Sequence, residues 1–579
     1  KAAQAPVVAE AYVPAQNKVP SPSPSQEGEI YVNQLGDVPN APKYATLVRS
    51  ATTPISWQIR NHTGQTMLTG QSAYYGLNPA SGQTVHTLDF SALNIPGTYT
   101  LLSGAYTSPP FKIADDIYKQ LKHDALLYFP HSRVGVPIKS EFATPATPAL
   151  SRPAGHMNET VGCFVGEDRR GTLWTGCNPT QDVSGGWYDA GDFGKYTVGT
   201  GYAVWMMLNT YERLENTNSA KASEFHDGRL SISEGHNGQN DLLDIARTGI
   251  EFMLKMQIND DAPREIIRGE QGEGAVNITK ALVNGMVYHK VHADLDTPIP
   301  LRPADDDLPR ALYTPSTAST LHVAAIGAQC ARLWRRVDRG FSDKCLSAAT
   351  RAYEAALANP DVYAYDIDWG GGGYEDEQVS DEFFWATAEL YLTTGAEKYR
   401  TRLNTYRSGV GDSLGARNGH WAYVEYLGLM SILAQSPRYE TEDIPQYLQD
   451  ARTSIVSVAD RFMAQTQTSA YGLPYDGTTY YWGSNANLLS RAMILASAYS
   501  VNGNTDYHAG VIRVMDYLLG RNPMGTSYIS GYGQKAMSNP HHRFWANGKD
   551  ATLPKPPPGT LSGGPNSVNF IEPVSQSLE

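Results

Sequence analysis

Two aspartates stand three residues apart in a Gly-rich loop that reads GGWYDAGDFGKY over residues 185–196. Only Ala and Gly lie between Asp189 and Asp192, so both carboxylates can converge on one small target. The glycines allow backbone shapes that other residues resist. Trp187 and Tyr188 supply aromatic faces for a bound ligand and lower the local dielectric. Taken alone, the pair could equally be a surface turn or a weak calcium loop, but a calcium loop needs more oxygen ligands nearby.

Composition narrows the class of protein. Lys and Arg number 46 against 59 Asp and Glu, which gives a formal net charge of −13 over 579 residues. No basic run is present, which argues against a nucleic-acid partner. No stretch of ~18 apolar residues occurs, so we expect no membrane span. The 35 Tyr, 14 Phe and 10 Trp suit a sugar-binding surface, although such rings also fill ordinary cores.

The first part of the chain changes from a polar tail to short alternating segments. Residues 1–28 are rich in Ala, Pro, Ser and Gln and cannot bury enough apolar area to order themselves, so we expect a flexible segment. In residues 29–113 apolar side chains alternate, as at Ile55, Trp57 and Ile59. Turn signals between these segments predict a small antiparallel β-sandwich.

Beyond residue 113 the apolar period becomes that of helices. The first predicted helix covers 117–128, opened by Asp115 and Asp116 and stopped by Pro130. Further helices are predicted near 197–215, 241–257, 317–337, 343–358, 381–394, 397–406, 419–435, 446–466, 487–500 and 505–520. About a dozen helices favour pairs that close into a ring. A solenoid of helical pairs is the alternative, but no fixed period recurs.

Several sequence blocks together resemble one enzyme family. The loop GGWYDAGDFGKY resembles a signature of the family 9 glycoside hydrolases, which are inverting β-1,4-glycan hydrolases that include many cellulases. The further blocks, in the family's order, are NDLLDIARTGIEFMLKMQ (240–257), MVYHKV (286–291), SDEFFWATAELYLTTG (380–395), YLLGRNPMG (517–525) and the second signature TSYISGYGQKAMSNPHHR (526–543). IYVNQLGDVPNAPKYA (30–45) is similar to the immunoglobulin-like module that precedes some of these catalytic domains. The resemblance implies a mainly α chain, with an (α/α)6 barrel over 114–579 after an immunoglobulin-like β-sandwich.

Inverting hydrolysis needs two carboxyl groups with different roles. One is ionised and deprotonates a water, and the other donates a proton to the leaving oxygen, with ~6.5–9.5 Å between them. The resemblance implies that Asp192 is the general base and that Asp189 helps to hold the same water. His541 and Arg543 correspond to the family's sugar-contacting pair, and a guanidinium fork suits sugar hydroxyls.

The family's third signature, which carries the general acid Glu, has no match. The only acidic residues after Asp550 are Glu572 and Glu579, and neither stands in the context of that motif. Three explanations stay open: a truncated tail, a foreign Leu-Glu end, and a catalytically defective relative. We favour the truncated tail because the other two signatures are intact. Loss of the general acid costs ~10²–10⁴-fold in rate, so we expect the chain as written to be a weak catalyst.

The resemblance leaves the substrate open between a β-1,4-glucan or its oligosaccharides and chitosan oligosaccharides. Some relatives with this organisation resemble exo-β-D-glucosaminidases, and the negative net charge would favour an amine-bearing sugar. Residues 136–184 are a candidate wall that would block one end of the groove. A non-catalytic carbohydrate-binding relative is a further alternative. Family analogy implies a secreted or periplasmic protein, although the chain opens KAAQAPVVAE without a signal peptide.

The chain has four cysteines, which form two local pairs: Cys163 with Cys177, and Cys330 with Cys345. Two local disulfides and buried thiols are equally compatible with this spacing. Together with His156, the first pair could ligate zinc, but a fourth ligand is not evident.

We expect that no cofactor is required, although a structural calcium ion is compatible with some acidic clusters. Asp381 and Glu382 could bind calcium, as related blocks do in some family members. A better explanation is that acidic residues in a first helical turn are favoured by the helix dipole. Residues 305–307 are predicted to be a solvated acidic turn.

Overall fold

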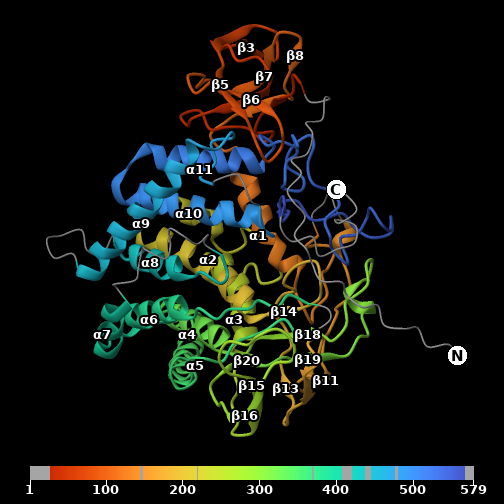
Figure 1. Cartoon of the computed structure of the whole chain (residues 1–579), viewed down its shortest axis with the longest axis vertical. Helices are drawn as coiled ribbons and strands as arrows, with labels where there is room; N and C mark the ends of the chain where they lie inside the picture. The colour runs from red at the N-terminus through yellow and green to blue at the C-terminus, as the bar shows by residue number, and fades with distance from the viewer. Residues whose placement is uncertain are drawn as a thin grey trace.

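The computed structural model describes residues 27–143, 148–217, 219–367, 371–406, 420–436, 445–475 and 480–567. Most of the predicted tail, together with Glu572 and Glu579, lies outside these ranges. A small β-sandwich forms one end of the molecule, and a larger body of helices with short hairpins follows it (Figure 1). No helix in the described part of the chain is long and apolar enough to cross a membrane.

The sandwich consists of two antiparallel sheets. One has the order β1 (Ile30–Tyr31), β2 (Tyr44–Val48), β6 (Thr84–Asp89) and β5 (Ala73–Leu77). The other has the order β4 (Thr66–Gln71), β3 (Ser56–Asn61), β7 (Gly97–Ser103) and β8 (Tyr106–Thr107), with β9 (Phe111–Ile113) also paired to β7. Trp57 and Ile59 are buried between the sheets, and Ile55 packs beside them. The predicted sandwich and its alternation are therefore confirmed.

Eleven α-helices lie in the described ranges. Their bounds are α1 (Lys119–His131), α2 (Thr197–Asn216), α3 (Asp241–Lys255), α4 (Thr317–Trp334), α5 (Arg339–Ala358), α6 (Ser380–Thr394), α7 (Glu397–Tyr406), α8 (Glu425–Leu433), α9 (Gln446–Thr466), α10 (Ser484–Asn502) and α11 (Thr505–Leu518). Helix α4 is buried along nearly its whole length because α2, α5 and α6 pack around it. Neighbouring helices pair in succession, as α4 with α5 and α10 with α11.

The first helix corrects one prediction. Helix α1 begins at Lys119 rather than at residue 117, and Pro130 lies inside it. A proline this close to the end removes a single helical hydrogen bond, so it does not stop the helix. The backbone N–H of Ser132 donates to the carbonyl oxygens of Tyr128 and Phe129 and closes the last turn.

Short strands gather at one end of the helices, in the lower part of Figure 1. The strands β14 (Lys195–Tyr196), β18 (Lys290–Ala293) and β19 (Arg310–Leu312) form a three-stranded antiparallel sheet. The other strands of this region form two-stranded sheets. These pair β10 (Thr160–Val161) with β13 (Gln181–Asp182), β11 (Val165–Glu167) with β12 (Leu173–Thr175), β15 (Pro263–Ile267) with β16 (Ile278–Leu282), and β17 (Val287–Tyr288) with β20 (Pro315–Ser316). The three-stranded sheet matters most for function, because β14 directly follows the loop with the two aspartates.

The cysteines separate into two kinds. Cys163 and Cys177 form a disulfide within residues 136–184, so neither thiol is available to ligate zinc with His156. Cys330 and Cys345 are free thiols buried between α4 and α5. The sequence left disulfides and thiols open, and the structure contains one pair of each.

Candidate active site

The loop with the two aspartates is closed by a backbone hydrogen bond and held in place by a buried lysine. The N–H of Asp189 donates to the carbonyl oxygen of Gly194 at 2.9 Å, which brings the two carboxylates onto one side of a tight turn. Lys195 is fully buried, and its ammonium group donates to the carbonyl oxygens of Val183 (2.6 Å) and Gly185 (3.0 Å). It also pairs with the buried carboxylate of Glu159. A buried cation with an acidic partner thus holds the start of the loop in place.

Asp192 has one carboxylate oxygen surrounded by donors. Its Oδ2 accepts from Nε2 of His292 at 3.0 Å, from the N–H of Gly194 at 3.2 Å and from the hydroxyl of Tyr196 at 3.5 Å. Burial alone would raise the pKa of Asp192, but the hydrogen bond and charge of His292 and the charge of Arg543 lower it below its ordinary value. Asp192 is therefore ionised at neutral pH.

The pKa of Asp189 is shifted in the opposite direction, above its ordinary value. Its Oδ2 accepts a hydrogen bond from the hydroxyl of Tyr374. Burial raises the pKa of Asp189 to about 7; the bond from Tyr374 works against this rise, and the charge of Asp192 adds to it. The loop thus places one firmly ionised carboxylate beside one that titrates near neutral pH. Such a split between two nearby carboxyl groups is typical of sites that move protons.

The segment with His541 and Arg543 reaches the loop by its backbone. The N–H of Arg543 donates to the carbonyl oxygen of Gly191 at 2.9 Å, and a Cβ at Gly191 would lie 2.1 Å from the carbonyl oxygen of His541. Only glycine fits at this approach. The Arg543 guanidinium donates to the carbonyl oxygen of Thr297 and pairs with Asp296, while His541 is exposed. The structure therefore brings both predicted residues to the edge of the aspartate loop.

Trp187 and Tyr188 occupy a different place from the one predicted. Trp187 is 4% exposed and packs on Phe129 and against Gly249, where a Cβ would lie 2.5 Å from its ring. Tyr188 is buried beside Phe193. Both rings are covered by protein. The structure therefore favours a role in packing the loop, rather than the predicted role in stacking on a sugar.

One residue of the acidic stretch 305–307, Asp306, also differs from its prediction. The Asp306 side chain is fully covered, and its Oδ2 accepts from Nε2 of His156 at 3.3 Å. The hydroxyl of Tyr188 contacts Nδ1 of the same histidine at 2.7 Å. The prediction of a solvated turn is therefore wrong for Asp306, which helps to support the aspartate loop through His156.

Three residues at the site were missed by the sequence reasoning. Tyr374 comes from the Gly-rich segment 371–379, and half-buried Trp421 packs on its ring at a centroid distance of 4.8 Å. His292 lies on β18, one residue beyond the family block that ends at Val291. Its hydrogen-bonding partner is 100 residues away in sequence, so local spacing gave no signal. For Tyr374, the run of glycines and acids before α6 was the available signal.

The predicted calcium residues open helix α6. Asp381 and Glu382 lie in its first turn, and burial together with the charge of Asp376 raises the pKa of both carboxyl groups. The charge of Asp381 raises the pKa of Glu382 further, whereas the hydrogen bond with Glu382 works against the rise at Asp381. In the described ranges, no group of three or more His, Cys, Asp or Glu side chains could hold a metal ion. The place of Asp381 and Glu382 in the first turn of α6 agrees with the explanation by the helix dipole, which the sequence favoured over a calcium site.

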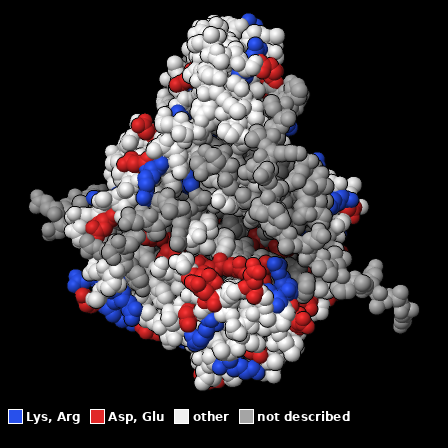
Figure 2. Space-filling view, in the orientation of Figure 1, with Lys and Arg blue, Asp and Glu red and all other residues white. Residues whose placement is uncertain are grey.

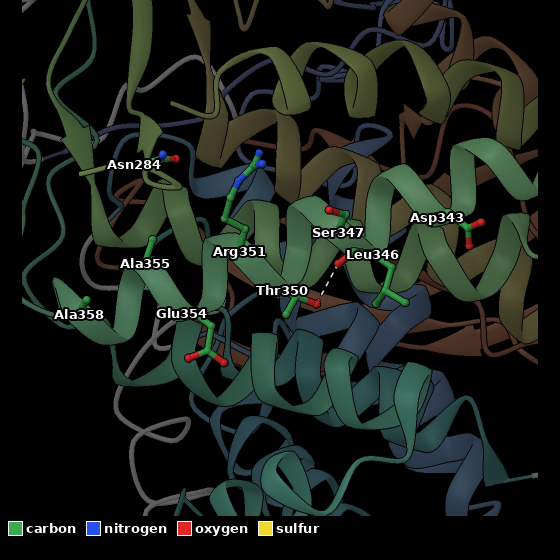
Figure 3. Close-up of a pocket in the computed structure, with 9 residues that line it drawn as sticks. All are labelled: Asn284, Asp343, Leu346, Ser347, Thr350, Arg351, Glu354, Ala355 and Ala358. Atoms are coloured by element: carbon green, nitrogen blue, oxygen red, sulfur yellow. Dashed lines mark hydrogen bonds between the residues drawn. The ribbon is translucent and has the colours of Figure 1, made fainter. Parts of the chain in front are cut away.

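Acidic groups mark the outer surface on the face shown in Figure 2, where Asp and Glu side chains gather along the lower edge of a hollow. A separate groove runs along the outer side of α5, lined by Asn284 and by helix residues such as Arg351 and Glu354 (Figure 3). None of the predicted site residues lines that groove.

Comparison with known proteins defines the class. The family model "Glycosyl hydrolase family 9" matches residues 118–577, and the model "Cellulase N-terminal ig-like domain" matches residues 25–108. The chain therefore belongs to glycosyl hydrolase family 9, as the sequence blocks predicted. A solved structure, "Bacteroides ovatus GH9", superimposes with a TM-score of 0.76 at 28% identity and covers 93% of this chain and 92% of that one. These matches confirm the predicted (α/α)6 barrel behind an immunoglobulin-like sandwich, and they exclude the solenoid alternative.

Two curated relatives are similar over nearly the whole chain. The chain is 37% identical to the Cellulose 1,4-beta-cellobiosidase of Acetivibrio thermocellus, over 94% of this chain and 62% of the relative. It is 38% identical to Endoglucanase C of Cellulomonas fimi, over 95% of this chain and 48% of the relative. The chain thus spans only about half to three fifths of the length of these relatives.

Proposed function

We propose that this protein hydrolyses β-1,4-glycosidic bonds with inversion, with Asp192 as the general base and Asp189 as a second ligand of the attacking water. The observation that carries the proposal is the asymmetry of the Asp192 carboxylate. Its Oδ2 accepts from three donors, whereas no other described residue donates a hydrogen bond to Oδ1. An ionised oxygen without a donor from another residue at the edge of a loop is suited to take a proton from water.

In the proposed step the water oxygen bonds to the anomeric carbon as the glycosidic C–O bond breaks. The proton of the water passes to Oδ1 of Asp192, while the Asp189 carboxyl accepts from or donates to the same water. The leaving oxygen is protonated by a general acid that we do not assign to a described residue. Proton transfer and displacement complete the reaction, so the proposed mechanism requires no cofactor.

The substrate that we propose is a β-1,4-linked glucan or its oligosaccharides. Support comes from the names of the two similar relatives, a cellobiosidase and an endoglucanase. The acidic surface and the net charge of −13 keep chitosan oligosaccharides as the alternative substrate in the test. The disulfide between Cys163 and Cys177 supports a secreted or periplasmic location, because such bonds persist in oxidising compartments. We also propose the domain limits 29–113 and 114–579.

The proposal is tested on the full-length protein with cello-oligosaccharides and with chitosan oligosaccharides in parallel. We expect turnover of the first, with the α-anomer as the initial product in proton NMR. Asp192→Asn should lower kcat by ~10²–10⁴-fold with the same binding of oligosaccharide. Asp307→Asn, an exposed acid, is the matched control and should leave kcat unchanged.

Each other outcome has a definite meaning. Turnover of chitosan oligosaccharides alone would replace the proposed substrate. Binding without turnover would favour the non-catalytic relative, and a small effect of Asp192→Asn would place the base elsewhere.

A further inference from the structure

The imidazole ring of His292 lies between two hydrogen-bond acceptors. Its Nδ1 is 2.6 Å from the carbonyl oxygen of Ala293, and its Nε2 is 3.0 Å from Oδ2 of Asp192. A carbonyl oxygen only accepts, so Nδ1 carries a proton. An ionised carboxylate also only accepts, so Nε2 must carry a second proton. Both contacts are hydrogen bonds at the same time only if the ring is an imidazolium while Asp192 is ionised.

We propose that His292 is a positioning residue for the general base, and that its imidazolium form fixes Oδ2 of Asp192 so that Oδ1 faces the water. This inference rests on the function proposed above. His292 would act through Asp192 and need not touch the sugar. Its positive charge keeps Asp192 ionised, and its two bonds fix the plane of the carboxylate.

The fold builds this contact from two distant segments. Antiparallel pairing of β14 with β18 sets Lys195 opposite Val291, which brings His292 beside the aspartate loop. Gly194 leaves the space between the two side chains open. A Cβ there would lie 2.4 Å from Cδ2 of His292 and 2.7 Å from Oδ2 of Asp192. The ring itself is 1% exposed, so its contact with Oδ2 of Asp192 is shielded from salt, whereas the Asp192 side chain is 16% exposed.

Other titratable groups also face Asp192 and must be considered in any pH effect. They are Asp189 and Tyr196 on the same segment, Tyr128 of α1, Tyr374 of segment 371–379, and His542 and Arg543 of the C-terminal loop.

These neighbours do not replace His292. Burial lowers the pKa of His542 to about 3, and its Nδ1 accepts from two backbone N–H groups, so this ring is neutral. The Arg543 guanidinium donates to Thr297 and pairs with Asp296. In the described part of the chain, His292 is the charged side chain that donates directly to Asp192.

The test measures the pH dependence of kcat/KM for β-cellobiosyl fluoride, whose fluoride leaves with little need for a general acid, so that the base limits the rate. His292→Phe removes both the donor and the charge, whereas His292→Gln keeps a donor without the charge. We expect the acidic limb to move up by ~1–3 pH units in both variants, because loss of the cation raises the pKa of the base. At the plateau, kcat should fall ~10–100-fold in His292→Phe and less in His292→Gln, as for supporting residues at other sites.

His86→Gln is the matched control. This histidine of the sandwich is also buried, between the hydroxyl of Ser72 (2.9 Å) and the carbonyl oxygen of Ala51 (2.7 Å). Its replacement should lower stability without moving the acidic limb. An acidic limb that stays in place in both His292 variants would overturn the proposal, because a merely structural histidine would affect stability alone.

A second measurement does not depend on turnover. The ¹⁵N chemical shifts of the His292 ring at about pH 6 should show two protonated nitrogens in the wild type and a neutral ring in Asp192→Asn. A neutral ring in the wild type would overturn the imidazolium. If the wild type hydrolyses neither the fluoride nor any oligosaccharide, the proposed function fails, while the shifts still decide the charge of His292.

Discussion

Asp189 and Asp192 differ by three positions in sequence and by their protonation at neutral pH. Donors surround one oxygen of Asp192 and lower its pKa, whereas Asp189 receives the hydroxyl of Tyr374 in a buried position and has a pKa of about 7. The difference arises from what each carboxylate faces, because both lie in the same turn. A general base must be ionised, so this electrostatic split supports Asp192 rather than Asp189 in that role.

The raised pKa of Asp189 makes stability depend on pH. An unfolded Asp has a pKa of about 3.9, so the folded state binds more protons between pH ~4 and ~7. The contribution of this group is therefore complete below pH ~4 and is lost as the pH rises through ~7. We expect urea unfolding to show a free energy of unfolding that falls over this interval in the wild type and falls less in Asp189→Asn.

Asp182 provides the control with the opposite sign. The pKa of Asp182 is lowered to about 2: its bonds with Ser184 and Lys255 outweigh the opposing effect of burial. Its stabilising contribution is present above pH ~4 and is lost as the pH falls through ~2. Asp182→Asn should leave the slope between pH 4 and 7 unchanged, and equal slopes in wild type and Asp189→Asn would contradict the raised pKa.

At the scale of residues, the sequence predicted the features that depend only on neighbouring positions in the chain. The two aspartates and the glycines between them are visible in twelve residues, and the family resemblance supplied their proposed roles. The hydrogen-bonding partners of their carboxylates, Tyr374 and His292, come from segments 185 and 100 residues away. Such contacts depend on the tertiary fold and leave no periodic signal. The burial of Trp187 was missed because an aromatic ring in a polar loop can face either the ligand or the core.

At the scale of elements, the first turn of α2 positions Asp189. Gly199 lies in that turn, and a Cβ there would be 2.4 Å from Oδ1 of Asp189. Gly199→Ala should therefore displace the carboxylate and lower kcat ~10-fold or more, as small misplacements of a catalytic group do. The measurement is kcat on cello-oligosaccharides, with the melting temperature as a second readout.

Gly340 in α5 is a suitable comparison for Gly199. The nearest atom to a Cβ at Gly340 is Oδ1 of Asp338, at 3.7 Å, so alanine fits there. Gly340→Ala should raise stability by ~0.4–1 kcal/mol and leave kcat unchanged. Unchanged kcat in Gly199→Ala would show that α2 does not set the position of Asp189.

Helices were predictable from their apolar period, and their ends less so. Helix α10 begins three residues earlier than expected, at Ser484 after Gly483, and α1 contains Pro130. Both differences concern helix termini, where capping and tertiary packing outweigh the periodic signal. The pairing of β14 with β18 was not predicted, because strands of two and four residues carry almost no alternation. This unpredicted pairing brings His292 to the site.

At the scale of the whole molecule, the sandwich and the barrel share a buried polar contact. Asn33, just after β1, donates to Oδ1 of Asp516 on α11 at 3.1 Å and to the hydroxyl of Tyr118, which precedes α1, at 2.8 Å. Burial raises the pKa of Asp516 to about 6, and Arg521 and Asn33 act against that rise. The sandwich thus supplies a hydrogen-bond donor to a buried carboxylate of the barrel, and we expect the two domains to unfold in one transition.

Asn33→Ala tests this dependence. The variant leaves the Asp516 carboxylate without a donor from the sandwich, which should cost ~1–3 kcal/mol. The loss of stability should be larger at pH 8 than at pH 5, because Asp516 is charged only above its raised pKa of about 6. Removal of the donor also raises that pKa further. Calorimetry should show a lower melting temperature for the whole chain. Gln58→Ala, at an exposed pair with Thr66 on the sandwich, should change stability by less than ~0.5 kcal/mol. If Asn33→Ala melted the sandwich early and left the barrel transition in place, the domains would be independent, and the buried contact between them would not couple their stability.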